Sequence, residues 1–238
     1  MDIPILYEDG DVVVVNKPSG LVVHSDGKTK EPTLADDWVL THYPETKNVG
    51  EPFVKDGVTI PRPGIVHRLD RATSGALVIA KNERAFEHLK RQFQEREVTK
   101  TYNAFVYGAM KEEDGVIDRP IGKSASDFRL RSAQRGARGV LREAVTEYTV
   151  LSRGADASFL EIRPKTGRTH QIRVHLKAIN HPVVCDTLYA PKRPPLFGFS
   201  RLALHARSIA FKTIGGEMVT VEAPLPEDFV AARKRIAS

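Results

Sequence analysis

Short apolar runs separated by polar turns along the chain predict a mixed α/β fold. Residues 3–7 and 12–16 are rich in β-formers and flank Glu-Asp-Gly-Asp, which predicts a hairpin. The run ALVIAK at 76–81 is almost wholly apolar, as in a buried strand. Alternating large side chains predict a further strand at 100–108. Later strands are expected at 144–151, 158–164 and 201–211. We therefore expect a central, largely antiparallel sheet flanked by helices.

Helical periodicity is confined to three segments. Asn82 is a suitable N-cap for a helix through about Glu97, with Phe86, Leu89 and Phe93 on one face. Two further helices are expected, one capped by Thr169 over 170–179 and one over 227–237.

Two segments lack a clear period. Residues 44–64 are rich in proline and glycine and predict a long surface loop with no assigned role. FRLRSAQRGARGVLR, at 128–142, has several arginines and no acidic residue, which predicts a hairpin or a mobile loop that presents positive charge. Arg119 and Lys123 extend that charge upstream.

Charge and cysteine content narrow the functional class. The formal net charge is +6 and the isoelectric point is near 9.4, which suggests a polyanionic partner without establishing one. Cys185 is the only cysteine, so no intramolecular disulfide forms, as is usual in a reducing compartment. Because the first residues resemble no signal peptide and no run has the length of a membrane span, we expect a cytoplasmic protein without a membrane partner.

Common cofactor and nucleophile motifs are missing. No histidine pair has HxxxH spacing, and the chain contains no phosphate-binding P-loop and no GxGxxG. Ser74 lies in ATSGA, which is not the GxSxG of a hydrolase. We expect a reaction that uses neither metal nor cofactor.

Asp70, in GIVHRLDRATSG (64–75), is the carboxylate that the sequence singles out. Between Arg68 and Arg71 it could be a surface ion pair of little energetic value. It also lies between the proline-rich segment and a buried strand, where side chains can line a cleft. A partly buried carboxylate beside an arginine stays ionised and can act as a nucleophile. Glycoside hydrolysis would need a second carboxylate, and none has a comparable setting.

The segment 170–179 allows two interpretations. Ile172, Leu176 and Ile179 share one side of the helix, and His170, Arg173 and Lys177 share the other. The basic side is either a solvated face or one that directs Arg173 at an anion. Upstream, the glycine-containing turn PKTGRT places Lys165 and Arg168 where they suit phosphate contacts.

HRLDRATSG resembles the signature of the RluA-type family of RNA pseudouridine synthases. Four more blocks resemble that family in the same order, and together they span nearly the whole chain: NKPSGLVVH (16–24), KRQFQEREVTKTYNAFVYG (90–108), PKTGRTHQIRVHLKAINHPVVCDTLY (164–189) and RLALHARSIAF (201–211). Five ordered blocks make a chance match improbable. The resemblance implies the pseudouridine synthase fold with a catalytic cleft, and a single catalytic domain over 1–238 without a separate N-terminal RNA-binding domain.

The resemblance also implies a reaction and its residues. Uridine in RNA becomes pseudouridine without metal or redox cofactor. Asp70 would be the nucleophile, or the base that starts glycal formation. Arg68 would help displace the target base from its stack. Tyr102 would stack on the flipped uracil, although it could also be a core residue. Arg173 would pair with the aspartate, and Arg168 is the second candidate for that pairing. His67 is expected to be structural, contacting backbone, and Thr73-Ser74-Gly75 to shape the turn.

The expected partner is a stem-loop of ribosomal RNA or transfer RNA, bound by a monomer. Two rivals are a non-catalytic RNA-binding protein on the same fold and a carboxylate-based nucleosidase or glycosidase. The intact set Asp70, Tyr102 and Arg173 argues against the first, and the lack of a paired carboxylate argues against the second. The expected RNA-binding residues are Arg68, Arg71, Lys17, Arg129, Arg131, Lys165 and Arg168.

Overall fold

The chain folds into two compact units with mixed α/β structure. The first unit is Met1–Thr99 with Ala206–Pro224, and the second is Lys100–His205 with Leu225–Ser238. This computed structural model describes residues 1–25, 31–55, 57–125, 127, 130–134 and 136–236. The strands pair antiparallel in both units, so the predicted fold class is confirmed. Of the helices described, none combines the length and the apolar character needed to cross a bilayer.

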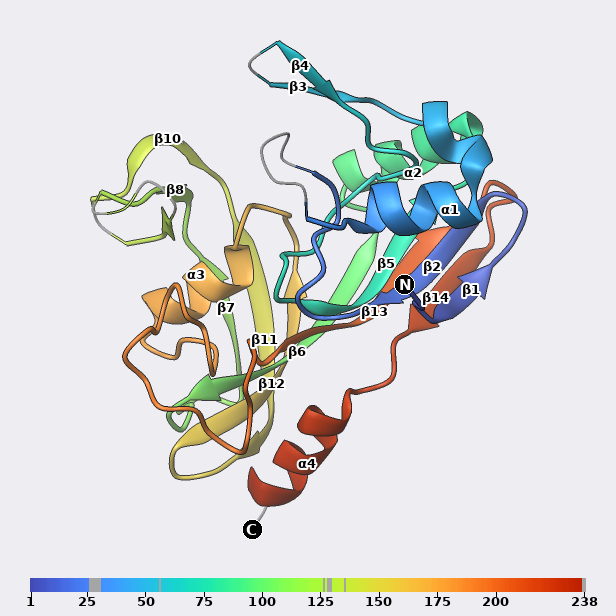
Figure 1. Ribbon diagram of the computed structural model, residues 1–238. Helices are drawn as coiled ribbons and strands as arrows, with labels where there is room; N and C mark the ends of the chain where they lie inside the picture. The colour runs from blue at the N-terminus through green and yellow to red at the C-terminus, as the bar shows by residue number, and fades with distance from the viewer. Residues whose placement is uncertain (26–30, 56, 126, 128–129, 135, 237–238) are drawn as a thin grey trace. The chain divides into compact units, whose positions relative to one another are not determined.

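The first unit is built on a sheet whose strands follow the order β1, β2, β5, β13, with β14 paired to β13 (Figure 1). The predicted hairpin is confirmed as β1 (Ile5–Glu8) and β2 (Val12–Lys17), and β5 (Ser74–Ala80) is the buried strand expected at 76–81. The other two strands are β13 (Leu204–Lys212) and β14 (Met218–Glu222).

Helix α2 (Glu83–Gln94) covers one face of this sheet. The Asn82 side chain accepts a hydrogen bond from the Ala85 backbone, as an N-cap does. Phe86 and Leu89 are buried against the sheet. The helix ends three residues before the predicted Glu97, and its existence, cap and apolar face are confirmed.

The segment 44–64 is not the one long loop that the sequence predicted. It contains the 3-10 helix η2 (Pro44–Asn48) and a hairpin of β3 (Phe53–Lys55) and β4 (Val58–Ile60). Upstream lie the short helices η1 (Leu34–Val39) and α1 (Leu40–His42), which also were not predicted. In the sequence, Gly57 between two β-rich triplets was the signal for this hairpin, but the surrounding prolines obscured it. In the structure Gly57 has the positive φ that such a turn requires.

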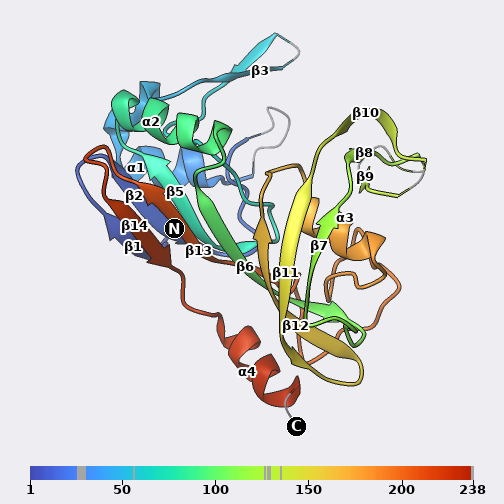
Figure 2. The ribbon, with the colours of Figure 1, turned by 180° about the vertical axis from the view of Figure 1, so that it is seen from behind.

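The second unit contains the sheet β6, β12, β11, β7, in that order (Figure 2). These strands are β6 (Thr99–Tyr107), β12 (Ala157–Pro164), β11 (Val145–Arg153) and β7 (Asp114–Asp118), of which the first three were predicted. The C-terminal helix α4 (Glu227–Ile236) packs on β12, as Figure 2 shows. Contacts between aromatic rings hold this helix to the core of the unit, through Phe105, Phe159, Phe199 and Phe229.

The arginine-rich segment is part of a small separate sheet. Strands β9 (Arg131–Ser132) and β10 (Arg138–Arg142) do not form a hairpin with each other, because both pair with β8 (Ile121–Lys123). All five residues of β10 are exposed, so the expected display of positive charge is confirmed for its two arginines. Residues 128 and 129, and therefore the predicted contact Arg129, lie outside the described residues.

Helix α3 (Gln171–Ala178) begins differently from the prediction. The N-cap is His170, with φ of 57°, and not Thr169. The His170 side chain makes no capping hydrogen bond. The Gln171 side chain instead holds the turn before the helix, because its carbonyl oxygen accepts from the Arg168 backbone N–H (3.0 Å) and from the Thr166 hydroxyl (2.6 Å). Almost every side chain of α3 is buried, so the interpretation as a solvated basic face is wrong.

Candidate active site

Asp70 lies in a tight turn directly before the buried strand β5. Its backbone carbonyl accepts from the Thr73 N–H at 3.0 Å, and its side chain is half-buried. Gly75 has φ of +115°, and a Cβ there would lie 2.2 Å from the Ala206 carbonyl oxygen. Only glycine fits this approach of two backbones. The Thr73 N–H closes the turn and Gly75 permits the approach of the two backbones, so the predicted turn-shaping role is confirmed for these two residues.

The KPSG loop holds that turn in place. The Ser19 hydroxyl donates to the Ala72 carbonyl (2.7 Å), and the Gly20 N–H donates to the Arg71 carbonyl (2.8 Å). Lys17 is completely buried, and its ammonium donates to the carbonyls of Pro18 (2.8 Å), Leu21 (2.8 Å) and Arg71 (3.2 Å). This corrects the prediction that Lys17 contacts RNA, because a buried ammonium surrounded by carbonyls is a structural cross-link.

The arginines that flank Asp70 are exposed and contact other groups. Arg71 forms an ion pair with Glu31 (2.8 Å) and donates to the Gly20 carbonyl (3.1 Å). Arg68 approaches the His24 ring at 3.3 Å, from Nη1 to Nε2. Burial lowers the pKa of His24, and the positive charges of Arg62 and Arg68 lower it further, which favours the neutral ring that can accept from Arg68.

His67 is structural, as predicted. Its Nε2 accepts from the Val78 backbone N–H at 3.1 Å, which ties the segment before Asp70 to strand β5. Its ring stacks on Phe93 of α2 with 4.7 Å between the ring centroids. The histidine of the HRLD motif therefore contributes to positioning the turn.

Tyr102 belongs to the second unit, where it lies on β6 opposite Ile162 of β12. The side chain is half-buried, an exposure that suits a stacking platform as well as partial core filling. Lys100 lies two residues earlier, so strand alternation places both side chains on one face of β6. Burial lowers the pKa of Lys100. Sequence reasoning missed this lysine, although the alternation in KTY was the available signal.

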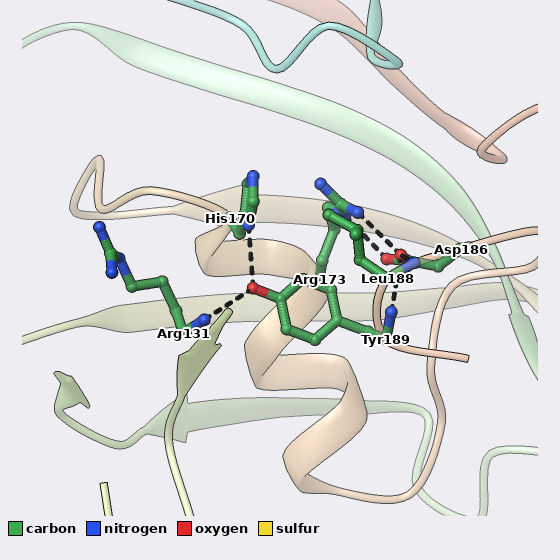
Figure 3. A network of polar contacts seen from close by, with 6 residues as sticks. All are labelled: Arg131, His170, Arg173, Asp186, Leu188 and Tyr189. Carbon is green, nitrogen blue, oxygen red and sulfur yellow. Dashed lines mark hydrogen bonds and ion pairs between the residues drawn. The ribbon is translucent and has the colours of Figure 1, made fainter. Parts of the chain in front are cut away.

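Arg173 is the centre of a buried polar network (Figure 3). Its Nε and Nη2 donate to the two carboxylate oxygens of Asp186, at 2.7 and 2.8 Å, and both side chains are almost fully buried. The prediction that Arg173 faces an anion is thus confirmed for Asp186, a partner that the sequence did not indicate. The predicted pairing with Asp70, a residue of the first unit, stays a prediction.

Tyr189 extends this network to the arginine-rich segment. Figure 3 shows its hydroxyl between the backbone of Arg131 and the ring of His170; these contacts are 3.0 and 2.9 Å. Arg173 lies over the Tyr189 ring, 5.0 Å from its centroid. Arg131 therefore enters the network through its backbone N–H, and its predicted phosphate contact stays a prediction.

The other two predicted phosphate contacts have partners within the second unit. Lys165 pairs with Glu147 at 2.7 Å, with both side chains well exposed. Arg168 donates through Nε to the Glu143 carbonyl at 3.0 Å. Exposed pairs of this kind exchange partners at little cost, so both residues keep the ability to bind phosphate.

Within the part of the chain that the structure describes, no three His, Cys, Asp or Glu side chains are placed to hold a metal ion. The expectation of a reaction without metal or cofactor stays a prediction.

Comparisons with known proteins decide the family. A family model described as RNA pseudouridylate synthase matches residues 11–178. A ribosomal large subunit pseudouridine synthase D of Vibrio parahaemolyticus is 38% identical over 245 residues, which cover 97% of this chain and 70% of that protein. The chain belongs to the RluA-type family of RNA pseudouridine synthases. It is thus an isomerase, and the family that its five sequence blocks resemble is confirmed.

Further relatives agree with this membership of the pseudouridine synthases. An RNA pseudouridine synthase of Bacillus subtilis is 42% identical over 229 residues, which cover 96% of this chain and 71% of that protein. The structure of human RNA pseudouridylate synthase domain containing 1 superposes with a TM-score of 0.74 at 30% identity, covering 94% of this chain and 84% of that one. These matches extend over both units.

Proposed function

We propose that this pseudouridine synthase modifies uridine in a stem-loop of ribosomal RNA, with Asp70 as the catalytic carboxylate. Several relatives carry names that specify the large ribosomal subunit, which favours ribosomal RNA over transfer RNA. The formal charge of +6 suits a polyanionic substrate. The observation that carries the assignment of Asp70 is its turn. Hydrogen bonds from the KPSG loop and the close approach of Gly75 to Ala206 of β13 fix that turn.

The reaction exchanges one glycosidic bond for another within the same nucleotide. The bond from uracil N1 to ribose C1′ breaks, the base turns, and C5 bonds to C1′. The C5 hydrogen leaves as a proton, and N1 takes up a proton from the solvent. Asp70 attacks C1′, or it removes the proton from C2′ to give a glycal. In either case the carboxylate is regenerated, so the cycle consumes no co-reactant.

Other side chains supply the remaining steps of the proposal. Arg68 is exposed next to Asp70 and fills the space that the flipped uridine vacates, because removing a base from its stack costs a few kcal/mol. Tyr102 supplies an aromatic face for the uracil. Arg173 pairs with the Asp70 carboxylate, and Lys100 adds a cation on the face of β6 that carries Tyr102.

Phosphate contacts complete the proposed RNA interface. Arg71 beside the catalytic turn and Arg131 of the small sheet supply two of them, and Lys165 and Arg168 before α3 supply two more. Arg129 is proposed as a further phosphate contact on the basis of the sequence alone. The protein acts in the cytoplasm as a monomer in this proposal.

Tritium release from RNA labelled at uracil C5 tests the proposal, with ribosomal and transfer RNA assayed separately. The wild type should release tritium from ribosomal RNA, and Asp70→Asn should release none while it still binds that RNA. The matched control is Asp114→Asn, an exposed aspartate on β7 that should behave as the wild type. Release by Asp70→Asn would refute the catalytic assignment, and release from transfer RNA alone would refute the substrate.

A further inference from the structure

The second unit contains a cavity of about 440 Å³ near the end of α3. It lies between the last turn of that helix and the segment 189–193. Its buried lining residues are Pro182, Tyr189 and Ala190, which present a mainly apolar floor. None of the residues proposed to take part in catalysis lines it. The volume falls within the range typical of small-molecule sites and exceeds what one inorganic anion needs.

Three cations surround this floor. Lys177 is half-buried in the last turn of α3, and Lys192 and Arg193 are exposed on the opposite segment. Among the described residues, no carboxylate lies within ion-pair distance of any of the three, and none lines the cavity. At the helix end, Arg119 donates to the Ala178 carbonyl at 2.8 Å, which offsets the negative end of the helix dipole. The cavity is therefore electropositive.

The walls of the cavity are held rigidly. Asp186, paired with Arg173, accepts from the backbone N–H groups of Leu188 and Tyr189, both at 3.0 Å. Figure 3 shows this anchor and the Tyr189 ring that it positions. A pocket with a fixed wall needs little ordering when it binds a ligand.

The segment that carries the exposed cations is also fixed. The Arg193 N–H donates to the Ala190 carbonyl at 3.1 Å, and the Tyr107 hydroxyl donates to the Pro194 carbonyl at 2.8 Å. The Arg193 guanidinium lies over the Tyr107 ring, 5.5 Å from its centroid. Two cations are thus presented from a pinned segment instead of a loose loop.

We propose that this cavity binds one nucleotide unit of the RNA substrate, other than the target uridine. An apolar floor with a cationic rim matches the two parts of a nucleotide, because the nucleoside covers the floor and its phosphodiester groups meet the rim. A solvated inorganic anion would leave the floor uncovered, and an acidic peptide would not need it. The inference rests on the proposed function, since it assigns a second subsite to the same RNA.

The salt dependence of RNA binding tests this subsite. The double variant Lys192→Ala/Arg193→Ala removes both exposed cations, and Lys111→Ala removes an exposed lysine elsewhere in the same unit. Losing two phosphate contacts should lower the slope of log K against log salt by about 1.4 for single-stranded RNA. A slope equal to that of Lys111→Ala would overturn the inference.

Protection from an amine-acetylating reagent locates the contact independently. Bound ribosomal RNA should slow acetylation of Lys177 and Lys192 and leave that of Lys111 unchanged, as read by mass spectrometry. Equal rates with and without RNA at Lys177 and Lys192 would overturn the subsite. Both tests measure RNA binding and not catalysis. If the wild-type protein binds RNA but releases no tritium, the proposed function is refuted and the result for the subsite still stands. A wild type that binds no RNA would refute both.

Discussion

The pair of Arg173 and Asp186 should be the most costly single contact to break in the second unit. Asp186 has a fully buried carboxylate that accepts four hydrogen bonds, two from the Arg173 guanidinium and two from the backbone of Leu188 and Tyr189. The substitution Asp186→Ala leaves the guanidinium buried without this partner. It also removes the acceptor from two backbone N–H groups.

The expected cost follows from the burial of the pair. Removing one partner of a buried ion pair costs about 3–5 kcal/mol, because the remaining charge stays desolvated. The pair of Lys165 and Glu147 has similar N···O geometry at 2.7 Å, but its side chains are 49% and 38% exposed. Glu147→Ala should therefore cost less than about 1 kcal/mol. The two substitutions form a matched comparison of buried and exposed pairs in one unit.

Hydrogen exchange measures this difference where it arises. In Asp186→Ala the amide protons of Leu188 and Tyr189 should lose their protection, and urea unfolding followed by circular dichroism should show the loss of stability. Asp186→Asn keeps an acceptor for the two amides and should recover part of their protection but little of the stability. If Asp186→Ala costs no more than Glu147→Ala, the reasoning about burial is refuted.

Two further predictions concern the framework of each unit. Gly75→Ala should destabilise the first unit and abolish isomerisation, because its Cβ would meet the Ala206 carbonyl at 2.2 Å; a thermal melt at the wild-type temperature would contradict this. Burial lowers the pKa of His175, whose Nε2 contacts the Arg119 carbonyl at 2.9 Å, so the unfolded state takes up its proton first. The contribution of His175 to the free energy of unfolding is therefore complete above about pH 6.5. Below that pH it falls by up to about 1.4 kcal/mol per pH unit. Urea titrations at several pH values should show a weaker pH dependence of stability for His175→Gln, and an unchanged dependence would exclude His175 as its source.

Local patterns predicted those elements whose determinants lie close together in the chain. Helix α2 was predicted because Asn82 caps it and its apolar residues recur at helical spacing within the same twelve residues. The start of α3 was not, because the turn before it is held by Gln171, whose amide donates to the Val145 carbonyl 26 residues away at 3.0 Å. The N-cap preference that favours Thr169 depends on neighbouring residues only and does not include that distant contact.

The candidate site shows the same division. The motif around Asp70 was sufficient to single out the carboxylate and to predict its turn. Helical periodicity could show which side of α3 carries Arg173, but it could not show that Asp186, beyond the helix, meets it there. Lys17 was misassigned because a lysine after a strand is usually solvated, whereas one of the carbonyls it binds belongs to Arg71, 54 residues later.

The corrected role of Lys17 gives the sequence block NKPSGLVVH (16–24) a structural function. The KPSG loop donates hydrogen bonds to the carbonyls of Arg71 and Ala72, the two residues that follow Asp70. In the proposed reaction, the carboxylate acts at C1′ or at C2′ and must keep its position while the base turns. Misplacement of a reacting group by about 1 Å can cost about a hundredfold in rate. Hydrogen bonds from a neighbouring loop to the backbone of Arg71 and Ala72 restrict the turn that carries the carboxylate. On this argument, two motifs 50 residues apart in sequence act as one structural element, the first bracing the turn from which the second presents Asp70.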